Sequence, residues 1–287
     1  MKRRQFFTWT AGVVGMALAS YYPSSKVVAL DPESVSSPLF RFAALGNVGT
    51  SNLGQLAIAE VMNDYYQQHP FELVLMAGDN IYEDGEIRRV GATFSKPYYF
   101  LRKQGVPFNA VLGNHDVLTN NGKDQIKFSS FNMDGRYYSF TKGIVQYFAL
   151  NTTDILWTKQ QEWLEQTLAK SNATWKIVLA HHPLYSSGLH GSNEKLITMS
   201  PLFKRYGVQL YINGCDRNYE RTEVIDGTTY LTVGAGKNTH PMFGSKWTAH
   251  FAARLSFATI DVYPQKLVIQ GIGKNGKVFD RGKIIIN

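Results

Sequence analysis

Five short segments of the chain carry side chains that can bind a metal ion or move a proton. They are "GN" at 46–47, "GDNIY" at 78–82, "GNHD" at 113–116, "HHP" at 181–183 and "GCDRN" at 214–218. Asp79, Asn114, His115 and His181 lie in these segments, and His190 lies between the last two. Carboxylate, amide and imidazole groups are hard or borderline metal ligands, and imidazoles also carry protons. This set of groups suits metal-assisted cleavage of a phosphate ester.

The same five segments each follow the end of a predicted strand. Apolar runs predict strands at 39–45, 71–77, 108–112, 175–180 and 208–213, and helical patterns separate them at 53–68, 94–104, 160–170 and 194–206. Strands that alternate with helices indicate layered α/β packing. Because ligand sites of open α/β sheets lie outside the carboxyl ends of the strands, we expect the five segments to form one site.

The remaining predicted strands extend the sheet structure. A hairpin is predicted over 135–152, and the strand-rich tail over 222–287, with its glycine turns, predicts a second sheet. The folded domain is expected to span 39–287, since the preceding stretch is rich in serine and proline.

Cys215 is the only cysteine of the chain, and it could be a nucleophile, a metal ligand or a small buried apolar residue. The run "CDRNYER" from Cys215 to Arg221 matches the C-x5-R pattern of phosphatases that attack phosphorus with a thiolate. That mechanism requires a phosphate-cradling turn that leads into a helix. The residues after Asn218 predict a hairpin instead, which disfavours the nucleophile and leaves the other two alternatives open.

The N-terminal segment has the features of an export signal. Arg3 and Arg4 precede a short apolar run that ends near Ala19, which is typical of a twin-arginine signal over 1–29, cleaved after Ala19 or Ala29 and followed by a leader over 30–38. The apolar run is about half of the roughly 20 residues that a bilayer crossing requires. We therefore expect a periplasmic or extracellular protein without a stable membrane span after processing.

The charge balance favours a small anionic substrate. The net charge of the whole chain is +8, and removal of 1–29 takes away four basic residues and no acidic one, which leaves +4. The rest of the sequence lacks the runs of lysine and arginine, interleaved with aromatic residues, that are typical of nucleic-acid grooves, so no nucleic-acid partner is expected.

Five motifs in a fixed order carry a resemblance to a known family. "GDNIY", "GNHD", "LAHHPLYSSGLHG", "NGCDRN" and "TVGAGKNTHP" resemble the calcineurin-like metallophosphoesterases, specifically the small purple acid phosphatases, over about 39–243. The resemblance implies a four-layer αββα sandwich, an α/β fold of two mixed β-sheets flanked by helices. It also implies a dinuclear iron or iron–zinc centre between the loops of the sheets.

The resemblance implies roles for the residues that match the motifs of the family. Asp79 matches the carboxylate that bridges the two metals, and Tyr82 matches the tyrosinate that colours the ferric ion. Asn114 and His181 match ligands of the second metal. The histidines that orient phosphate and protonate the leaving group correspond to His115 and His190.

Three ligand positions depart from the family pattern. Asn47 replaces an aspartate, and Cys215 and Arg217 replace the two histidines of the closing motif. Arginine cannot lose its proton to bind a metal, so the first site is expected to hold no ion, Arg217 to bond Asp79 with a formal charge of zero between them, and Tyr82 to be a buried phenol. The second site keeps a candidate tetrahedral set: Asp79, Asn114, His181 and Cys215.

The cofactor expected is thus at most one divalent metal per chain, zinc rather than iron, or none. His182 follows the expected ligand His181 and is expected to point to the other side, while His240 has no expected partner. Three functions stay open: a phosphoric monoester hydrolase, an inert homologue in which Arg217 and Asn114 bind an anion, and a protein-binding module. The expected small-molecule partner is a phosphorylated substrate or inorganic phosphate, and the sequence predicts no oligomeric state.

Overall fold

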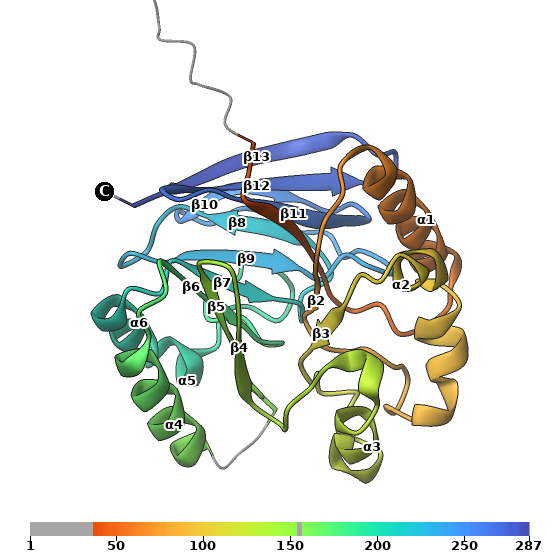
Figure 1. Ribbon diagram of the computed structural model, residues 1–287, viewed down its shortest axis with the longest axis horizontal. Coiled ribbons are helices and arrows are strands. Elements are labelled where there is room, and N and C mark those ends of the chain that lie inside the picture. Colours follow the sequence, from red (N-terminus) through yellow and green to blue (C-terminus); the bar gives the residue numbers. More distant parts are fainter. Residues whose placement is uncertain (1–36, 154–156, 287) are drawn as a thin grey trace, which may run out of the picture. The chain divides into compact units, whose positions relative to one another are not determined.

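The computed structural model describes residues 37–153 and 157–286 (Figure 1). The predicted signal at 1–29 and most of the leader at 30–38 lie outside the described residues. Within the described ranges, no helix is both long enough and apolar enough to cross a lipid bilayer.

Two mixed sheets form the centre of the described fold. The six-stranded sheet has the order β13-β12-β11-β1-β2-β3, and the seven-stranded sheet has the order β10-β8-β9-β7-β6-β5-β4. Their strands are β1 (Phe40–Leu45), β2 (Val74–Met76), β3 (Phe108–Ala110), β4 (Tyr138–Lys142), β5 (Val145–Ala149), β6 (Trp175–Leu179), β7 (Leu210–Asn213), β8 (Tyr219–Thr222), β9 (Thr229–Val233), β10 (Thr248–Ala252), β11 (Ser256–Val262), β12 (Lys266–Gly273) and β13 (Val278–Ile285).

The helices lie on the outer faces of the two sheets, with α1 and α2 on one side and α4, α5 and α6 on the other (Figure 1). They are α1 (Leu53–Gln68), α2 (Tyr99–Lys103), α3 (Lys123–Ile126), α4 (Trp157–Lys170), α5 (Glu194–Ile197) and α6 (Ser200–Tyr206), with 3₁₀ turns at Ile87–Arg89, Asn120–Gly122 and Ser129–Phe131 and a π-helix at Gly91–Ser95. The single helix predicted over 194–206 is wrong, because Pro201 lies in the first turn of α6, where the missing N–H of proline is tolerated.

The apolar core has two parts: one lies between the sheets and extends beneath α1, and the other lies beneath α4, α5 and α6. On β6, Ile177 packs in the first part and its neighbour Val178 packs in the second with α4 and α6, since successive strand residues face opposite sides. Between the sheets, the rings of Phe42 and Tyr147 meet edge to face with centroids 5.5 Å apart. The predicted four-layer α/β sandwich is confirmed.

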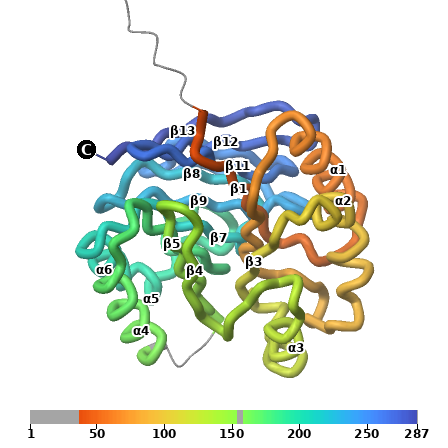
Figure 2. The backbone as a smooth tube through the Cα atoms, viewed as in Figure 1, coloured from red at the N-terminus to blue at the C-terminus, as the bar shows by residue number. Residues whose placement is uncertain are grey.

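A second sheet is present, as predicted, but the strands of the C-terminal tail are divided between the two sheets. β8, β9 and β10 belong to the seven-stranded sheet, whereas β11, β12 and β13 join β1. β1 pairs antiparallel with β11, with Phe40 opposite Val262 (Figure 2). The strand next to β1 in the six-stranded sheet is thereby supplied by residues more than 200 positions away in the chain.

A buried ion pair links the two sheets. Asp280 of β13 accepts hydrogen bonds from Arg221 Nε at 2.7 Å, Arg221 Nη2 at 2.9 Å and the Tyr219 hydroxyl at 2.7 Å, both from β8. The side chains of Arg221 and Asp280 are 15% and 4% exposed. The Arg221 guanidinium is therefore occupied by Asp280. This excludes a phosphate site formed by Cys215 and Arg221, as the C-x5-R pattern would require.

Asp280→Asn is expected to lower the free energy of unfolding by about 3 kcal/mol, since it leaves a largely buried guanidinium without its counter-ion. Burial opposes the charged form of Asp280, but the hydrogen bonds of Arg221 and Tyr219 hold its pKa below the usual value. Its contribution is therefore present above about pH 4 and is lost as the pH falls through the lowered pKa. Urea unfolding at several pH values measures both effects.

The matched control is Asp226→Asn, because Asp226 pairs with Lys204 where both side chains are more than half exposed. The loss for this surface pair is expected to be below about 1 kcal/mol. Equal losses for the two variants would contradict the importance of the link between the sheets.

Candidate active site

The turns after β1 and β2 place Asn47 and Asp79 beside one another. Both residues adopt a left-handed backbone conformation with φ of 55°, which asparagine and aspartate tolerate better than most residues. The Tyr82 hydroxyl donates to Asp79 Oδ2 and lies 3.1 Å from Asn47 Oδ1. Asn47 Nδ2 donates to the backbone oxygens of Cys215 and Gly234, at 3.1 and 3.0 Å. Asn47 thus joins three loops through hydrogen bonds.

Asp116 fixes the loops that carry Asp79 and Asn114. Its buried carboxylate accepts backbone hydrogen bonds from Asn80, Ile81 and Gly113 at 2.8 to 3.0 Å. The close approach of the two loops requires glycine at 113, because a Cβ there would lie 2.2 Å from Asp79 Oδ1. The sequence marks Asp116 only by its place in "GNHD". Its carboxylate nevertheless holds together the two loops that carry Asp79 and Asn114.

His181, Asn114 and Asp79 converge on one point. His181 Nδ1 donates to Ala77 O at 2.9 Å, and its Nε2 lies 3.0 Å from Asn114 Oδ1 and 3.7 Å from Asp79 Oδ1. Burial opposes the charged imidazolium, but the charge of Asp79 and the contacts with Cys215 and Ala77 together raise the pKa of His181 to about 10. The Nε2 proton is the one that a metal ion at this position would displace.

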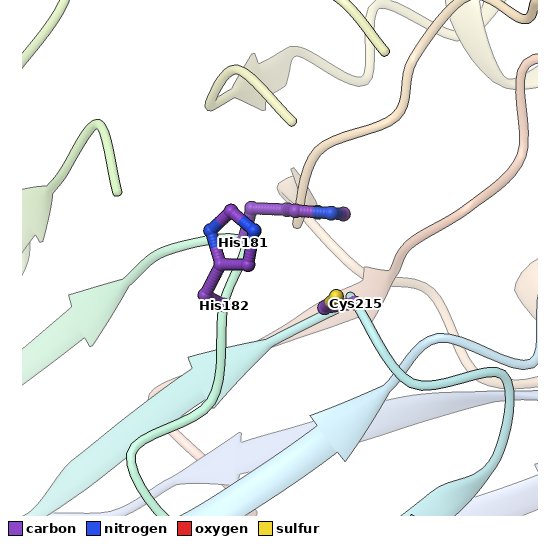
Figure 3. A group of neighbouring side chains, drawn as sticks. All are labelled: His181, His182 and Cys215. Carbon is purple, nitrogen blue, oxygen red and sulfur yellow. The ribbon is translucent and has the colours of Figure 1, made fainter. Parts of the chain in front are cut away.

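Cys215 lies beside both histidines of the "HHP" segment (Figure 3). One ligand atom from each of His181, His182 and Cys215 falls within 4.8 Å of the others. The prediction that His182 points away is wrong: β6 ends at Leu179, so the alternation of strand side chains no longer applies at 181 and 182. Thr152 Oγ1 is hydrogen-bonded to His182 Nδ1 at 2.9 Å, and burial lowers the pKa of His182 to about 4.

His190 forms a hydrogen-bonded pair with Asp216 at the edge of a cavity. His190 Nδ1 lies 2.7 Å from Asp216 Oδ1, and the backbone N–H of His190 donates to the same oxygen at 3.0 Å. The Ser186 hydroxyl donates to the other carboxylate oxygen. The cavity has a volume of about 630 Å³, and His190, Asn114, His182 and Cys215 are among its lining residues. The pairing of Nδ1 leaves Nε2 of His190 available to a ligand.

Arg217 does not bond Asp79, so the predicted contact is wrong. Within the described ranges, its only side-chain partner is His240, whose Nε2 lies 3.3 Å from Arg217 Nη1. The His240 N–H also donates to Arg217 O at 3.0 Å. Asp79 is already hydrogen-bonded to Tyr82 and to the His115 N–H, so it does not require the guanidinium.

Lys237 is a site residue that the sequence analysis missed. It is 7% exposed, and its Nζ lies 2.8 Å from the centroid of the Tyr82 ring. His115 contacts the same ring, with ring centroids 4.4 Å apart. Burial and the charge of Arg217 lower the pKa of Lys237 to about 8. The available signal was its place in "TVGAGKNTHP", a glycine-rich loop at the end of another strand.

The protonation of Tyr82 follows from its surroundings. Burial and the negative charge of Asp79 raise the pKa of Tyr82 far above its ordinary value. Against burial, His181 and the Tyr82 hydroxyl lower the pKa of Asp79. In this arrangement Tyr82 is a phenol that donates a hydrogen bond to a carboxylate.

Comparison with known proteins identifies the family. A model of the calcineurin-like phosphoesterases matches residues 41–214, more than half of the chain. The chain belongs to the calcineurin-like phosphoesterase family. Tartrate-resistant acid phosphatase type 5 of Oryctolagus cuniculus is 24% identical over 84% of this chain and 90% of its own length. Purple acid phosphatase 7 of Arabidopsis thaliana is 28% identical over 68% of this chain and 69% of its own length.

Solved structures show the same fold. A structure described as GAP50, the anchor in the inner membrane complex of Plasmodium, has a TM-score of 0.76 at 22% identity and covers 86% of this chain and 89% of its own. Purple acid phosphatase PPD1 from yellow lupin (Lupinus luteus) seeds has a TM-score of 0.68 at 20% identity, over 87% of this chain and 54% of its own. At these identities the likeness concerns the fold alone.

The two metal positions that the resemblance implies differ in how well the residues present fit an ion. At the first position, both Nδ2 protons of Asn47 are directed at carbonyl oxygens, Tyr82 is protonated and Arg217 is a permanent cation, so the residues do not fit. At the second position, an amide oxygen, a carboxylate oxygen and an imidazole nitrogen converge beside a thiol, which fits a borderline divalent ion such as zinc.

Proposed function

We propose that this protein hydrolyses phosphoric monoesters in the manner of an acid phosphatase, with at most one divalent metal per chain. The observation that carries this proposal is the His190–Asp216 pair, which lies at the same cavity as the residues of the second metal position. Family membership supports phosphoester hydrolase chemistry.

The proposed roles follow from the contacts. The residues that would hold the metal are Asp79, Asn114, His181 and Cys215, with His182 as a further candidate ligand. When bound, the metal would supply Lewis acidity. Arg217 and Asn114 bind the phosphate oxygens, because a planar guanidinium matches phosphate geometry. His190 donates its Nε2 proton to the leaving-group oxygen while Asp216 fixes the ring, and His115, held by Glu83 O at 2.6 Å, orients the phosphate.

Metal content and turnover test the proposal together. Protein purified without added metal is expected to bind no more than one ion per chain, zinc rather than iron, and to be colourless because Tyr82 is not a tyrosinate bound to iron. Elemental mass spectrometry counts the ions, and release of phosphate from a generic monoester measures turnover. Two tightly held ions per chain would contradict the electrostatic argument from Arg217 and Lys237.

A second candidate is an inert homologue that binds an anion or a protein partner. The observation that favours it is the hydrogen-bonded group of Asn47, Asp79 and Tyr82, which satisfies these side chains without a metal at the first position. Anion binding without turnover in the zinc-loaded protein would select this candidate. Export through the twin-arginine route, to the periplasm or the medium, is part of the proposal for either function.

A further inference from the structure

Lys237 and Arg217 are two cations that no carboxylate neutralises directly. Within the described ranges, neither side chain forms an ion pair, and Lys237 Nζ forms no hydrogen bond. The carboxylates of Asp79 and Glu83 act on Lys237 through their charge and oppose the lowering of its pKa. Arg217 contacts His240, which stays neutral because burial and the charge of Arg217 lower its pKa. The loops of the two cations lie side by side, since the backbone N–H of His240, three residues after Lys237, donates to Arg217 O at 3.0 Å. The charge of Arg217 accordingly lowers the pKa of Lys237.

The chain holds Lys237 in this position through its neighbours. A Cβ at Gly236 would lie 2.5 Å from Gly46 O. The close approach of this loop to the turn after β1 therefore requires glycine at position 236. Asn52, the N-cap residue of α1, donates from Nδ2 to Lys237 O at 3.3 Å. The position of the ammonium is thus set by backbone contacts on both sides.

The ammonium lies on the face of the phenol that the family resemblance assigns to the first metal. Cations bind aromatic faces, and the hydrogen bond from Tyr82 to Asp79 makes the ring richer in electrons. Asp79 and Arg217 alone have a formal charge of zero, and Lys237 raises the formal charge of the three residues to +1. A positive charge is therefore present before any metal binds.

We propose that Lys237 and Arg217 form an oxyanion-binding site that works without a metal, in which Lys237 takes the electrostatic place of the first metal ion. Its ligand class is a tetrahedral oxyanion such as phosphate, whose charge and oxygens match an ammonium with free donors and a guanidinium fork. The inference rests on the proposed function only in taking that anion to be the phosphate of a monoester.

Calorimetric titration of inorganic phosphate into protein stripped of metal with a chelator tests this site. The stripped wild type is expected to bind phosphate, and Lys237→Met is expected to bind it about tenfold to a hundredfold more weakly, the range for a lost charge-assisted hydrogen bond. The matched control is Lys246→Met, which removes an exposed lysine from the same connection between β9 and β10 and should leave the affinity within twofold.

Two further measurements separate the outcomes. If Lys237→Met does not fold, Arg217→Gln must weaken metal-free binding by at least tenfold, and the stripped wild type must gain thermal stability from phosphate. Wild-type protein that binds phosphate only after zinc is restored, or a folded Lys237→Met that binds it normally, would overturn the inference. Either result would leave the hydrolase proposal intact, because turnover by the zinc-loaded enzyme is measured separately.

Discussion

The variant that combines Asn47→Asp, Cys215→His, Arg217→His and Lys237→Ala is expected to bind two metal ions and to exceed the wild type in phosphatase activity by orders of magnitude. The first three changes restore the family ligands, and the fourth removes the ammonium that lies 2.8 Å from the Tyr82 ring. Two metal ions supply Lewis acidity and a bridging nucleophile, which account for much of the barrier lowering in such sites.

The matched control is the same variant with Lys237 retained. Because a buried ammonium repels a di- or trivalent ion beside Tyr82, this triple variant is expected to bind no more than one ion and to gain little activity. Iron-loaded protein offers a readout besides turnover, since only the quadruple variant should show the colour of a tyrosinate–iron centre. Two bound ions in the triple variant would contradict the role assigned to Lys237.

His190→Gln is expected to lower turnover of a monoester by about a hundredfold to ten thousandfold, the usual contribution of a general acid. The loss of turnover should be smaller for a 4-nitrophenyl ester than for an alkyl ester, because 4-nitrophenolate leaves without a proton more readily than an alkoxide does. Steady-state kinetics with 4-nitrophenyl phosphate and with an alkyl phosphate therefore distinguish a proton donor from a structural residue.

The control for this variant is His69→Gln, which changes an exposed histidine at the end of α1 and should leave both rates unchanged. A loss in His190→Gln that is equal for the two leaving groups would contradict proton donation from Nε2. Circular dichroism of each variant shows whether the hydrogen bond to Asp216 is needed for folding.

The sequence was sufficient to predict elements whose local signals agree with their surroundings. Residues 53–68 form one helix as predicted, because Asn52 caps it, accepting from Gln55 N at 2.9 Å, and because Ile58, Met62 and Tyr65 form one buried stripe. The strand ends also carry the polar segments together as expected, since β1, β2 and β3 are parallel neighbours.

The parts that could not be predicted depend on contacts between distant segments. Lys237 has no local feature that marks it as buried, and only the packing of its loop against the turn after β1 places its ammonium over Tyr82. His240 contacts Arg217 for the same reason. The motifs mark the positions at which this chain departs from the family pattern, but they do not show which residues provide charge there.

The pairing of β1 with β11 bears on how the protein is made. Phe40, the first residue of β1, lies opposite Val262 of β11, so the six-stranded sheet cannot form completely until about nine-tenths of the chain has left the ribosome. Native contacts of such large sequence separation slow folding and leave strand edges exposed in the meantime. Translocation of the unfolded chain would postpone the pairing of β1 with β11 until after the chain has crossed the membrane. The twin-arginine pathway carries chains that are already folded. Export by this route would allow β1 and β11 to pair in the cytoplasm, where chaperones can cover the unpaired side of β1 until β11 is synthesised.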